Sequence, residues 1–398
     1  MPQTETRNDE SRTAGRWIGV GSSDEADAAR AGRAAADAAM QGADPRLLVV
    51  FCSDAYDLDA LLHAIHSRSG GSVPLIGCST AGEISTAGPG DASVVVTAFG
   101  GDFEVSTGVG SGASSDLRAA GAGAAACVAD VRARRNKAVL ILTDGLAGDQ
   151  QEIVRGAYAE VGAAVPLVGG CAGDDLNMQA THQLYGGQVL RDAVVAAAIG
   201  SDHPIGIGVR HGWRKVGEPM LVTESDSNRV RRLDGRPALD VYLERLQARP
   251  EATADNAAFT RFALRHPLGL DRRSGEEVRF VRGADLEHRT LNCIADVPQG
   301  ALTWIMAGDE RSVLDATDAA CTEALAALEP EPPLGMLAFD CIARRGVLGE
   351  DGIRREVERV AQHARGTQVA GFYTYGEIAR VRGTTGFHNQ TLVVLAVA

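Results

Sequence analysis

Short apolar runs alternate with segments of helical periodicity along this chain, and the order repeats. Residues 47–51 form an apolar run typical of a buried strand, residues 58–66 carry apolar positions at helical spacing, and residues 73–76 form a second apolar run. This order predicts strand, helix, strand, a unit that normally makes a right-handed parallel crossover. Two further units follow the same order. Their predicted elements are 138–142, 153–161 and 165–168, and then 334–339, 352–365 and 368–370.

A glycine-rich motif ends each unit. The first motif, residues 77–84 (GCSTAGEI), and the last, residues 371–378 (GFYTYGEI), match at glycine, threonine, glycine, glutamate and isoleucine with identical spacing. The middle unit ends in a looser version, residues 169–175 (GGCAGDD), in which aspartates stand where the others have glutamate. A glycine at the end of a buried strand usually marks a turn or a close approach of backbone. The motif therefore indicates a shared architecture.

The segments that follow the first two motifs also correspond. Residues 94–112 and 194–212 share glycines and an aspartate at the same spacing. Each segment reads as a strand, a turn and a second strand, which predicts a hairpin added to the unit. The amino-terminal region is therefore interpreted as an internal duplication.

The chain is long enough for two domains. We expect a polar tail and lead-in over residues 1–30, a duplicated α/β domain over 31–231 and a second α/β domain over 232–398. Predicted elements of the second domain include strands at 278–281, 293–297, 302–306 and 392–397 and a helix at 313–328. The predicted class is α/β, mixed α+β in places, with two domains built from repeated strand-helix-strand units with added hairpins.

Composition narrows the class of protein. The chain has 52 acidic and 39 basic side chains, a net charge of −13, which disfavours nucleic acid and anionic lipid as partners. Its seven cysteines are scattered without C-x-x-C spacing, which indicates neither a disulfide framework nor a zinc site. No apolar run reaches the length of a membrane span, so a cytoplasmic protein without membrane insertion is expected.

Polar residues of the two matching motifs are candidates for ligand binding. Ligands of open α/β sheets bind at the carboxyl ends of strands, where Glu83 and Glu377 are expected. A carboxylate there could accept hydrogen bonds from an amine or hydroxyl ligand, and Thr80 and Thr374 each offer a donor and an acceptor. The alternative is that these glutamates cap turns or pair with an arginine.

Three further groups of residues are candidates. Asp174, with Asp175, takes the corresponding place in the middle motif, although turn chemistry explains most such pairs. Tyr373 and Tyr375 alternate along a strand, so they would share a face and offer a stacking wall with a polar tip; core packing is the alternative. The segment 386–391 (GFHNQT) adds His388 and Asn389.

Catalytic signatures are mostly missing from the sequence. It has no G-x-S-x-G, H-E-x-x-H or G-x-x-x-x-G-K-[ST] motif. Cys78 and Cys171 could act as nucleophiles beside a base, although free cysteine is more often a small buried filler. A protein that is not an enzyme is therefore favoured. His63 and His66 have a spacing able to hold a metal, but no further ligand lies near them in the sequence, so no metal site is predicted. One histidine would suffice as an axial haem ligand, for which His388 is the candidate.

Taken together, the three glycine motifs and the segment 387–391 (FHNQT) resemble the FIST family, named for F-box and intracellular signal transduction proteins. The resemblance covers residues from about 30 to 398, with a FIST N segment to about 230 and a FIST C segment after it. It implies a sensory module that binds a small ligand, with amino acids or related metabolites among the proposed ligands. Some stand-alone members of similar length bind haem, sense nitric oxide and regulate a histidine kinase.

The leading hypothesis is therefore a cytosolic sensor that holds a small ligand between its domains, near the glycine motifs. Neither an F-box nor an output domain is expected in this chain, so a separate signalling protein such as a histidine kinase would read the signal. Two alternatives remain at this point: a haem-binding nitric-oxide sensor, and an enzyme that uses Cys78 or Cys171. No cofactor is required by the leading hypothesis.

Overall fold

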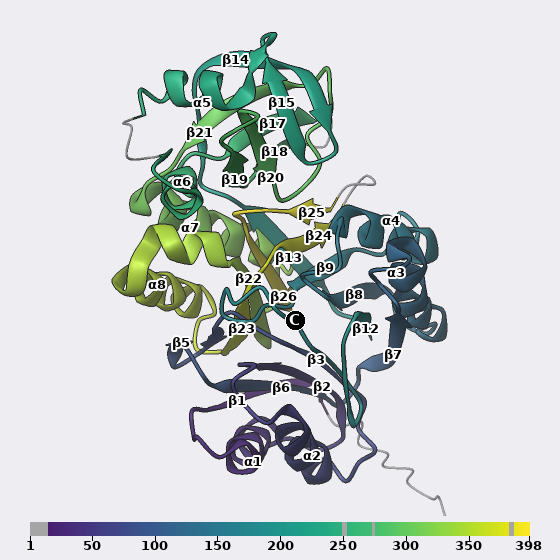
Figure 1. Cartoon of the computed structure of the whole chain (residues 1–398). Helices are drawn as coiled ribbons and strands as arrows, with labels where there is room; N and C mark the ends of the chain where they lie inside the picture. Colours follow the sequence, from purple (N-terminus) through teal and green to yellow (C-terminus); the bar gives the residue numbers. More distant parts are fainter. Residues whose placement is uncertain (1–14, 249–252, 273–274, 382–385) are drawn as a thin grey trace, which may run out of the picture.

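The computed structural model describes residues 15–248, 253–272, 275–381 and 386–398 of the chain. Three repeats of the order strand, helix, strand, helix, strand, hairpin, strand form its body (Figure 1). The predicted α/β class and its repeated strand-helix-strand units are confirmed. In each repeat the two central strands pair in parallel, as expected for the crossover.

The elements of the repeats are as follows. Repeat 1 contains β1 (Trp17–Ser23), α1 (Ala28–Ala39), β2 (Pro45–Cys52), α2 (Leu58–Arg68), β3 (Leu75–Ser79), β4 (Glu83–Ser85), β5 (Gly88–Gly90) and β6 (Val94–Gly100). Repeat 2 contains β7 (Glu104–Ser111), α3 (Leu117–Ala125), the 3-10 helix Ala126–Asp130, β8 (Asn136–Thr143), α4 (Gln150–Val161), β9 (Leu167–Cys171), β10 (Gln183–Tyr185), β11 (Gln188–Leu190) and β12 (Ala193–Ser201). Repeat 3 contains β13 (Ile205–Arg210), α7 (Glu310–Ala326), β22 (Gly335–Cys341), α8 (Ile342–His363, kinked at Gly349), β23 (Gln368–Thr374), β24 (Glu377–Arg380), β25 (Phe387–His388) and β26 (Leu392–Val397).

A further sheet interrupts repeat 3 between β13 and α7. This inserted domain, residues 214–307, forms an eight-stranded sheet at the top of Figure 1. Its elements are β14 (Arg214–Asp226), β15 (Arg229–Leu233), β16 (Arg236–Pro237), α5 (Ala238–Arg245), α6 (Asn256–Ala263), β17 (Leu268–Arg272), β18 (Gly275–Arg279), β19 (Val281–Asp285), β20 (Thr290–Cys293) and β21 (Leu302–Ala307). The predicted boundary near residue 232 falls within it. Of the predicted amino-terminal tail, residues 1–14 lie outside the described residues, and β1 begins at Trp17.

The repeats exchange their hairpins in a closed cycle. The hairpin β4–β5 of repeat 1 extends the sheet of repeat 3, β10–β11 of repeat 2 extends the sheet of repeat 1, and β24–β25 of repeat 3 extends the sheet of repeat 2. Each body sheet therefore has six strands drawn from more than one repeat. The exchange makes the three repeats depend on one another for their edges.

The hairpins predicted over residues 94–112 and 194–212 were wrong in their pairing. The two strands of each segment join different sheets: β6 pairs with β1 and β2, whereas β7 pairs with β12. Likewise β12 pairs with β7 and β8, and β13 pairs with β26. Both strands of a segment must bury apolar residues, and the inner faces of two adjacent sheets provide more apolar contact than a single hairpin would. The shared glycines mark the passage from one repeat to the next.

The inner faces of the three sheets meet in one apolar core, with the helix pairs outside (Figure 1). Phe51 of β2, Phe339 of β22 and Phe372 of β23 pack with ring centroids 4.7–6.1 Å apart. Leu140 and Val195 join the same cluster from the sheet of repeat 2. Full burial of an apolar side chain of this size stabilises the fold by about 1.5–3 kcal/mol.

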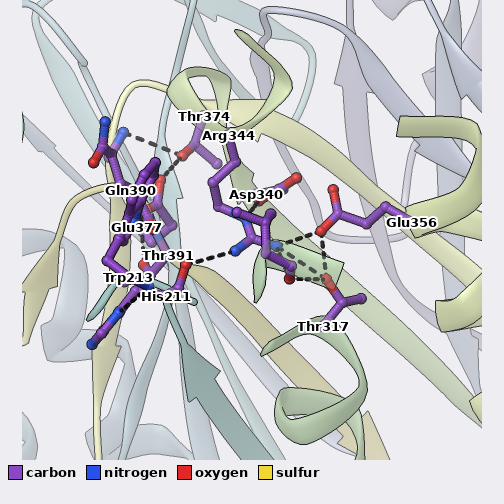
Figure 2. Close-up of polar contacts among 12 residues, drawn as sticks. His211, Trp213, Thr317, Asp340, Arg344, Glu356, Thr374, Glu377, Gln390 and Thr391 are labelled. Atoms are coloured by element: carbon purple, nitrogen blue, oxygen red, sulfur yellow. Dashed lines mark hydrogen bonds and ion pairs between the residues drawn. The ribbon is translucent and has the colours of Figure 1, made fainter. Parts of the chain in front are cut away.

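A buried cluster of charged residues fixes the start of α8 (Figure 2). The Arg344 guanidinium donates to Asp340 at 2.6 Å and also bonds to Glu356. The Thr317 hydroxyl, from α7, donates to Glu356 at 2.6 Å. A further bond from Arg344 reaches the carbonyl of His211, 3.1 Å away, just after β13. The cluster therefore ties α7, α8, β22 and the end of β13 together.

In the part of the chain that the structure describes, no helix is both long and apolar enough to cross a bilayer.

Candidate functional site

The three glycine motifs meet at one junction in the middle of the body. The N–H of Ala81 donates to Tyr373 at 3.0 Å, and the N–H of Tyr373 donates to Gly82 at 2.8 Å. Backbone bonds also link the other two pairs of motifs: Gly173 to Ser79 at 3.0 Å, Asp175 to Thr80 at 3.4 Å, Cys171 to Gly376 at 2.8 Å and Tyr375 to Cys171 at 3.2 Å. The motif therefore recurs because each copy satisfies the backbone groups of another copy.

The first glycine of each motif allows a close approach between parallel strands. A Cβ at Gly77, Gly169 or Gly371 would lie 1.9–2.4 Å from the carbonyl oxygen of a residue in the neighbouring strand. Any side chain at these positions would force the strands apart.

Glu83 and Glu377 are buried at this junction and fully engaged. Glu377 accepts from the Thr374 hydroxyl at 2.6 Å and from the N–H and hydroxyl of Thr391 at 3.0 and 2.7 Å (Figure 2). Glu83 has the same arrangement with Thr80 and Ser93. Burial raises the pKa of each glutamate to about 7, against the opposing effect of these donors. Each carboxyl thus links its motif, through hydrogen bonds, to the residue that precedes the strand after the exchanged hairpin.

In repeat 2 this role belongs to Asp144, at the end of β8. Asp144 accepts from the Thr181 hydroxyl at 2.7 Å and from the N–H of Asp192 at 3.1 Å, the residue that precedes β12. Ser93 and Thr391 precede β6 and β26 in the same way. The acid of repeat 2 therefore comes from the end of β8, whereas Glu83 and Glu377 belong to the glycine motifs themselves. The sequence offered one signal for Asp144, its place at the carboxyl end of a predicted strand.

Asp174 has a different role, as the support of a loop. Its carboxylate accepts from the N–H groups of Met178, Gln179 and Ala180 at 2.7–3.0 Å and from the Tyr375 hydroxyl. The Tyr375 oxygen also accepts from the N–H of Asp174 at 3.2 Å and of Leu176 at 2.7 Å. We call residues 174–180 the lip loop.

Beside this loop a cavity of about 840 Å³ lies between the body and the inserted domain. Its volume is in the upper part of the range of pockets that take drug-sized ligands, roughly 300–1,000 Å³. The body contributes Gly145, Leu146, Gly148–Gln150, Leu176, Met178, Cys341–Ala343, Tyr375, Phe387 and Asn389. The inserted domain contributes Ser227, Asn228, Asn256, Thr260, Phe280, Arg282–Ala284, Asn292 and Ile294–Asp296.

Two of the predicted site residues, Tyr375 and Asn389, line this cavity. Asn389 is buried, and among the described residues its side-chain oxygen has no hydrogen-bond partner. An acceptor left this way costs about 1–3 kcal/mol, so it marks a position where a ligand donor or a water would be stabilised.

The other predicted residues lie away from the cavity wall. Thr80, Glu83, Thr374 and Glu377 are committed to the junction described above. Tyr373 is buried in the core with the Arg345 guanidinium 5.2 Å from its ring centre. The strand β23 ends at Thr374, so Tyr373 and Tyr375 have different surroundings. No sequence motif marks the cavity residues of the inserted domain, so none of them was a candidate.

The histidine and cysteine candidates do not present a reactive atom to the cavity. The ring Nε2 of His388 is 2.9 Å from the carbonyl oxygen of Ala379, and His388 is not among the lining residues. Nε2 is therefore engaged as a donor, so His388 does not fit the role of an axial haem ligand. Cys78 and Cys171 are buried, and burial raises the pKa of both thiols far above neutrality. A protonated, buried thiol is a poor nucleophile.

These features define a triplicated α/β body with an inserted sheet domain and a cavity between the two. Two family matches cover most of the chain: a FIST N domain at residues 46–236 and a FIST C domain at residues 238–380. The chain belongs to the FIST family, as the motifs indicated. FIST domains are associated with signal transduction, and a role in small-ligand sensing is suggested for them.

Two proteins that are similar to this chain are both described as uncharacterized. An uncharacterized protein of Methanocaldococcus jannaschii is 29% identical over 163 residues, which make up 39% of this chain and 32% of that protein. An uncharacterized protein of Mycobacterium tuberculosis is 26% identical over 230 residues, 56% of this chain and 59% of that protein. The chain thus matches less than two thirds of the length of either relative.

Proposed function

We propose that this protein is a sensory module of intracellular signal transduction that binds a small molecule in the cavity between its body and its inserted domain. The observation that carries the proposal is the cavity itself, about 840 Å³ in volume with one wall from each part. A ligand that contacts both walls stabilises the relative position of body and inserted domain in which it touches both of them. Binding therefore shifts the population of arrangements, which a separate signalling protein could read.

The chemistry of the walls supports a binding role. About half of the lining side chains are apolar, among them Leu146, Ile294, Ile342 and Phe387, and polar side chains such as those of Asn292 and Asn389 stand between them. In small-molecule sites apolar walls provide affinity and polar groups fix the orientation of the ligand. The side-chain oxygen of Asn389 is one such polar group. Amino acids or related metabolites are ligands to test first.

A thermal-shift screen with a cavity-blocking variant tests the proposal. The purified protein is screened with amino acids, organic acids, nucleotides and sugar phosphates, and a compound at one hundred times its dissociation constant stabilises by about 2.7 kcal/mol. Ile294→Trp, on the inserted-domain wall, should abolish the stabilisation. Leu302→Trp places the same side chain at an exposed position of the same domain, outside the cavity, and should leave the stabilisation intact. Stabilisation that survives Ile294→Trp would place the ligand elsewhere.

A further inference from the structure

Two large apolar side chains of the lip loop are exposed to solvent at the edge of the cavity. Leu176 is 60% exposed and Met178 is 47% exposed, and both line the cavity. Exposed apolar side chains that gather around a hollow mark a surface that becomes covered when a ligand binds. The remaining apolar lining, which includes Phe280 and Ile294 on the facing wall, extends this surface across the cavity.

The backbone of the lip loop is held in a conformation that its residues do not favour. Asp175, Leu176 and Met178 have φ values of 50°, 64° and 54°, in the left-handed region that favours glycine. Each such residue costs about 1–3 kcal/mol, and such strain persists where the surroundings enforce it, most often at ligand-binding positions. Here Tyr375 and the Asp174 carboxylate enforce it, through the N–H groups of residues 174, 176 and 178–180.

The inserted domain supplies a cation at the opposite wall. Arg282, on β19, lines the cavity, is exposed, and makes no side-chain hydrogen bond or ion pair with any residue that the structure describes. The two acids of the lining are engaged: Asp149 caps α4 through the N–H of Gln151 at 3.0 Å, and Asp296 also has a partner. Arg282 is therefore the charged group of the lining that is free to receive an anion, and a guanidinium binds carboxylate or phosphate with two parallel hydrogen bonds.

We propose that the cavity takes an amphipathic anion, with its apolar body against Leu176 and Met178 and its carboxylate or phosphate on Arg282. The inference rests on the proposed function and narrows it. The size of the cavity and its apolar walls favour a molecule larger than a free small polar metabolite. Because the apolar contacts lie on the body and the cation lies on the inserted domain, such a ligand bridges the two.

Three probes with one apolar body test the charge requirement. They are 4-phenylbutanoate, 4-phenylbutanamide and 4-phenylbutylamine, with acetate and inorganic phosphate as anions that lack the apolar body. Calorimetric titration at constant ionic strength should give the butanoate about tenfold tighter binding than the amide, with the amine weakest and acetate and phosphate undetectable. Equal or tighter binding of the amide or the amine would contradict the proposal that the ligand is an anion. Binding of none of the three would overturn the inference as a whole.

Matched variants assign the two ends of the ligand. Arg282→Gln should lower the affinity for the butanoate about tenfold and leave the affinity for the amide unchanged. Arg231→Gln, at an exposed arginine of the same domain outside the cavity, should change neither affinity.

Met178→Ser should lower the affinity for all three probes. Val216→Ser, at an exposed apolar residue outside the cavity, should leave these affinities unchanged. An anion whose binding ignores Arg282→Gln would contradict the assignment. If the metabolite screen finds a neutral ligand that Ile294→Trp displaces, the proposed function stands and only this narrower inference fails.

Discussion

The Tyr375 hydroxyl oxygen accepts a hydrogen bond from the backbone N–H of Leu176 at 2.7 Å, although 199 residues separate the two in the chain. Tyr375 belongs to the last glycine motif and lines the cavity, and Leu176 belongs to the lip loop at the cavity edge. A side chain that lines the cavity is thus hydrogen-bonded to the loop at the cavity edge, so Tyr375 helps to fix the position of that loop.

Removal of the Tyr375 hydroxyl should loosen the lip loop. Tyr375→Phe keeps the ring but leaves the N–H of Leu176 and the Asp174 carboxylate without this partner. A loss of about 1.4 kcal/mol would raise amide exchange of residues 174–180 about tenfold in hydrogen–deuterium exchange. Tyr56→Phe removes a hydroxyl bonded to the carbonyls of Glu25 and Ala92 and should leave the exchange of the lip loop unchanged. Unchanged exchange in Tyr375→Phe would mean that the loop is held by Asp174 alone.

The carboxylates of the three junction acids should respond differently to conversion into amides. Both oxygens of Asp144 accept a backbone N–H, from Leu146 at 2.8 Å and from Asp192 at 3.1 Å. An amide nitrogen cannot accept either bond, so Asp144→Asn should cost about 1–3 kcal/mol in the free energy of unfolding. In Glu377 one oxygen accepts from the Thr374 hydroxyl and from no backbone N–H of the described residues, and this hydroxyl can turn and accept from an amide. Urea unfolding at pH 5 should show Glu377→Gln nearly neutral and Asp144→Asn destabilised; equal losses would contradict this distinction.

Stability should fall as the pH rises through the range in which Glu83 and Glu377 ionise. Burial raises the pKa of each from 4.5 to about 7, so between these values the folded protein keeps a proton that the unfolded chain releases. Each carboxyl therefore lowers the free energy of unfolding progressively from pH 4.5 to pH 7 and by a constant amount above.

A glutamine at position 377 should remove half of this pH dependence. With roughly 1.4 kcal/mol for each pKa unit, a shift of about 2.5 units corresponds to about 3 kcal/mol per carboxyl. Glu377→Gln should therefore match the wild-type protein near pH 5 and exceed its free energy of unfolding by up to about 3 kcal/mol at pH 8. A variant that is less stable than the wild-type protein at pH 8 would show that the ionised carboxylate stabilises the junction.

The first glycine of the last motif should tolerate no side chain. A Cβ at Gly371 would lie 1.9 Å from the carbonyl oxygen of Ala338 in the paired strand, so Gly371→Ala should cost about 3 kcal/mol or more. Gly123, inside α3, has its nearest neighbour atom 3.5 Å from such a Cβ. Gly123→Ala should gain up to about 1 kcal/mol from helix propensity. Urea unfolding of both variants gives the two changes in the free energy of unfolding. A Gly371→Ala variant as stable as the wild-type protein would show that the paired strands can move apart.

The sequence revealed the repeats but not how they join. The periodicity of residues 47–76 and its two recurrences depends on local burial, and the predicted strands and helices follow from it. Pairing of β6 and β7 with different sheets depends on contacts far apart in the chain, which a turn signal at Gly100 and Asp102 does not encode. A hairpin and a passage between sheets need the same turn residues.

The candidate site was partly predictable for a similar reason. Tyr375 was a candidate because it alternates with Tyr373 beside Glu377, and Asn389 because it lies in the polar segment before the last strand; both line the cavity. Glu83 and Glu377 were expected at the carboxyl edge of a sheet, yet they point into the junction and satisfy backbone donors there. Sequence spacing places a side chain near an edge, whereas the direction in which it points depends on the exchanged hairpins. The second wall of the cavity comes from an insertion that no motif connects to the repeats.

A crystal structure of the protein with the strongest stabiliser from the metabolite screen would show whether a small molecule binds between the body and the inserted domain. We expect the compound in the cavity, in contact with Tyr375 from the body and Ile294 from the inserted domain. A compound bound at another surface, with this cavity filled only by solvent, would mean that the cavity is not the ligand site.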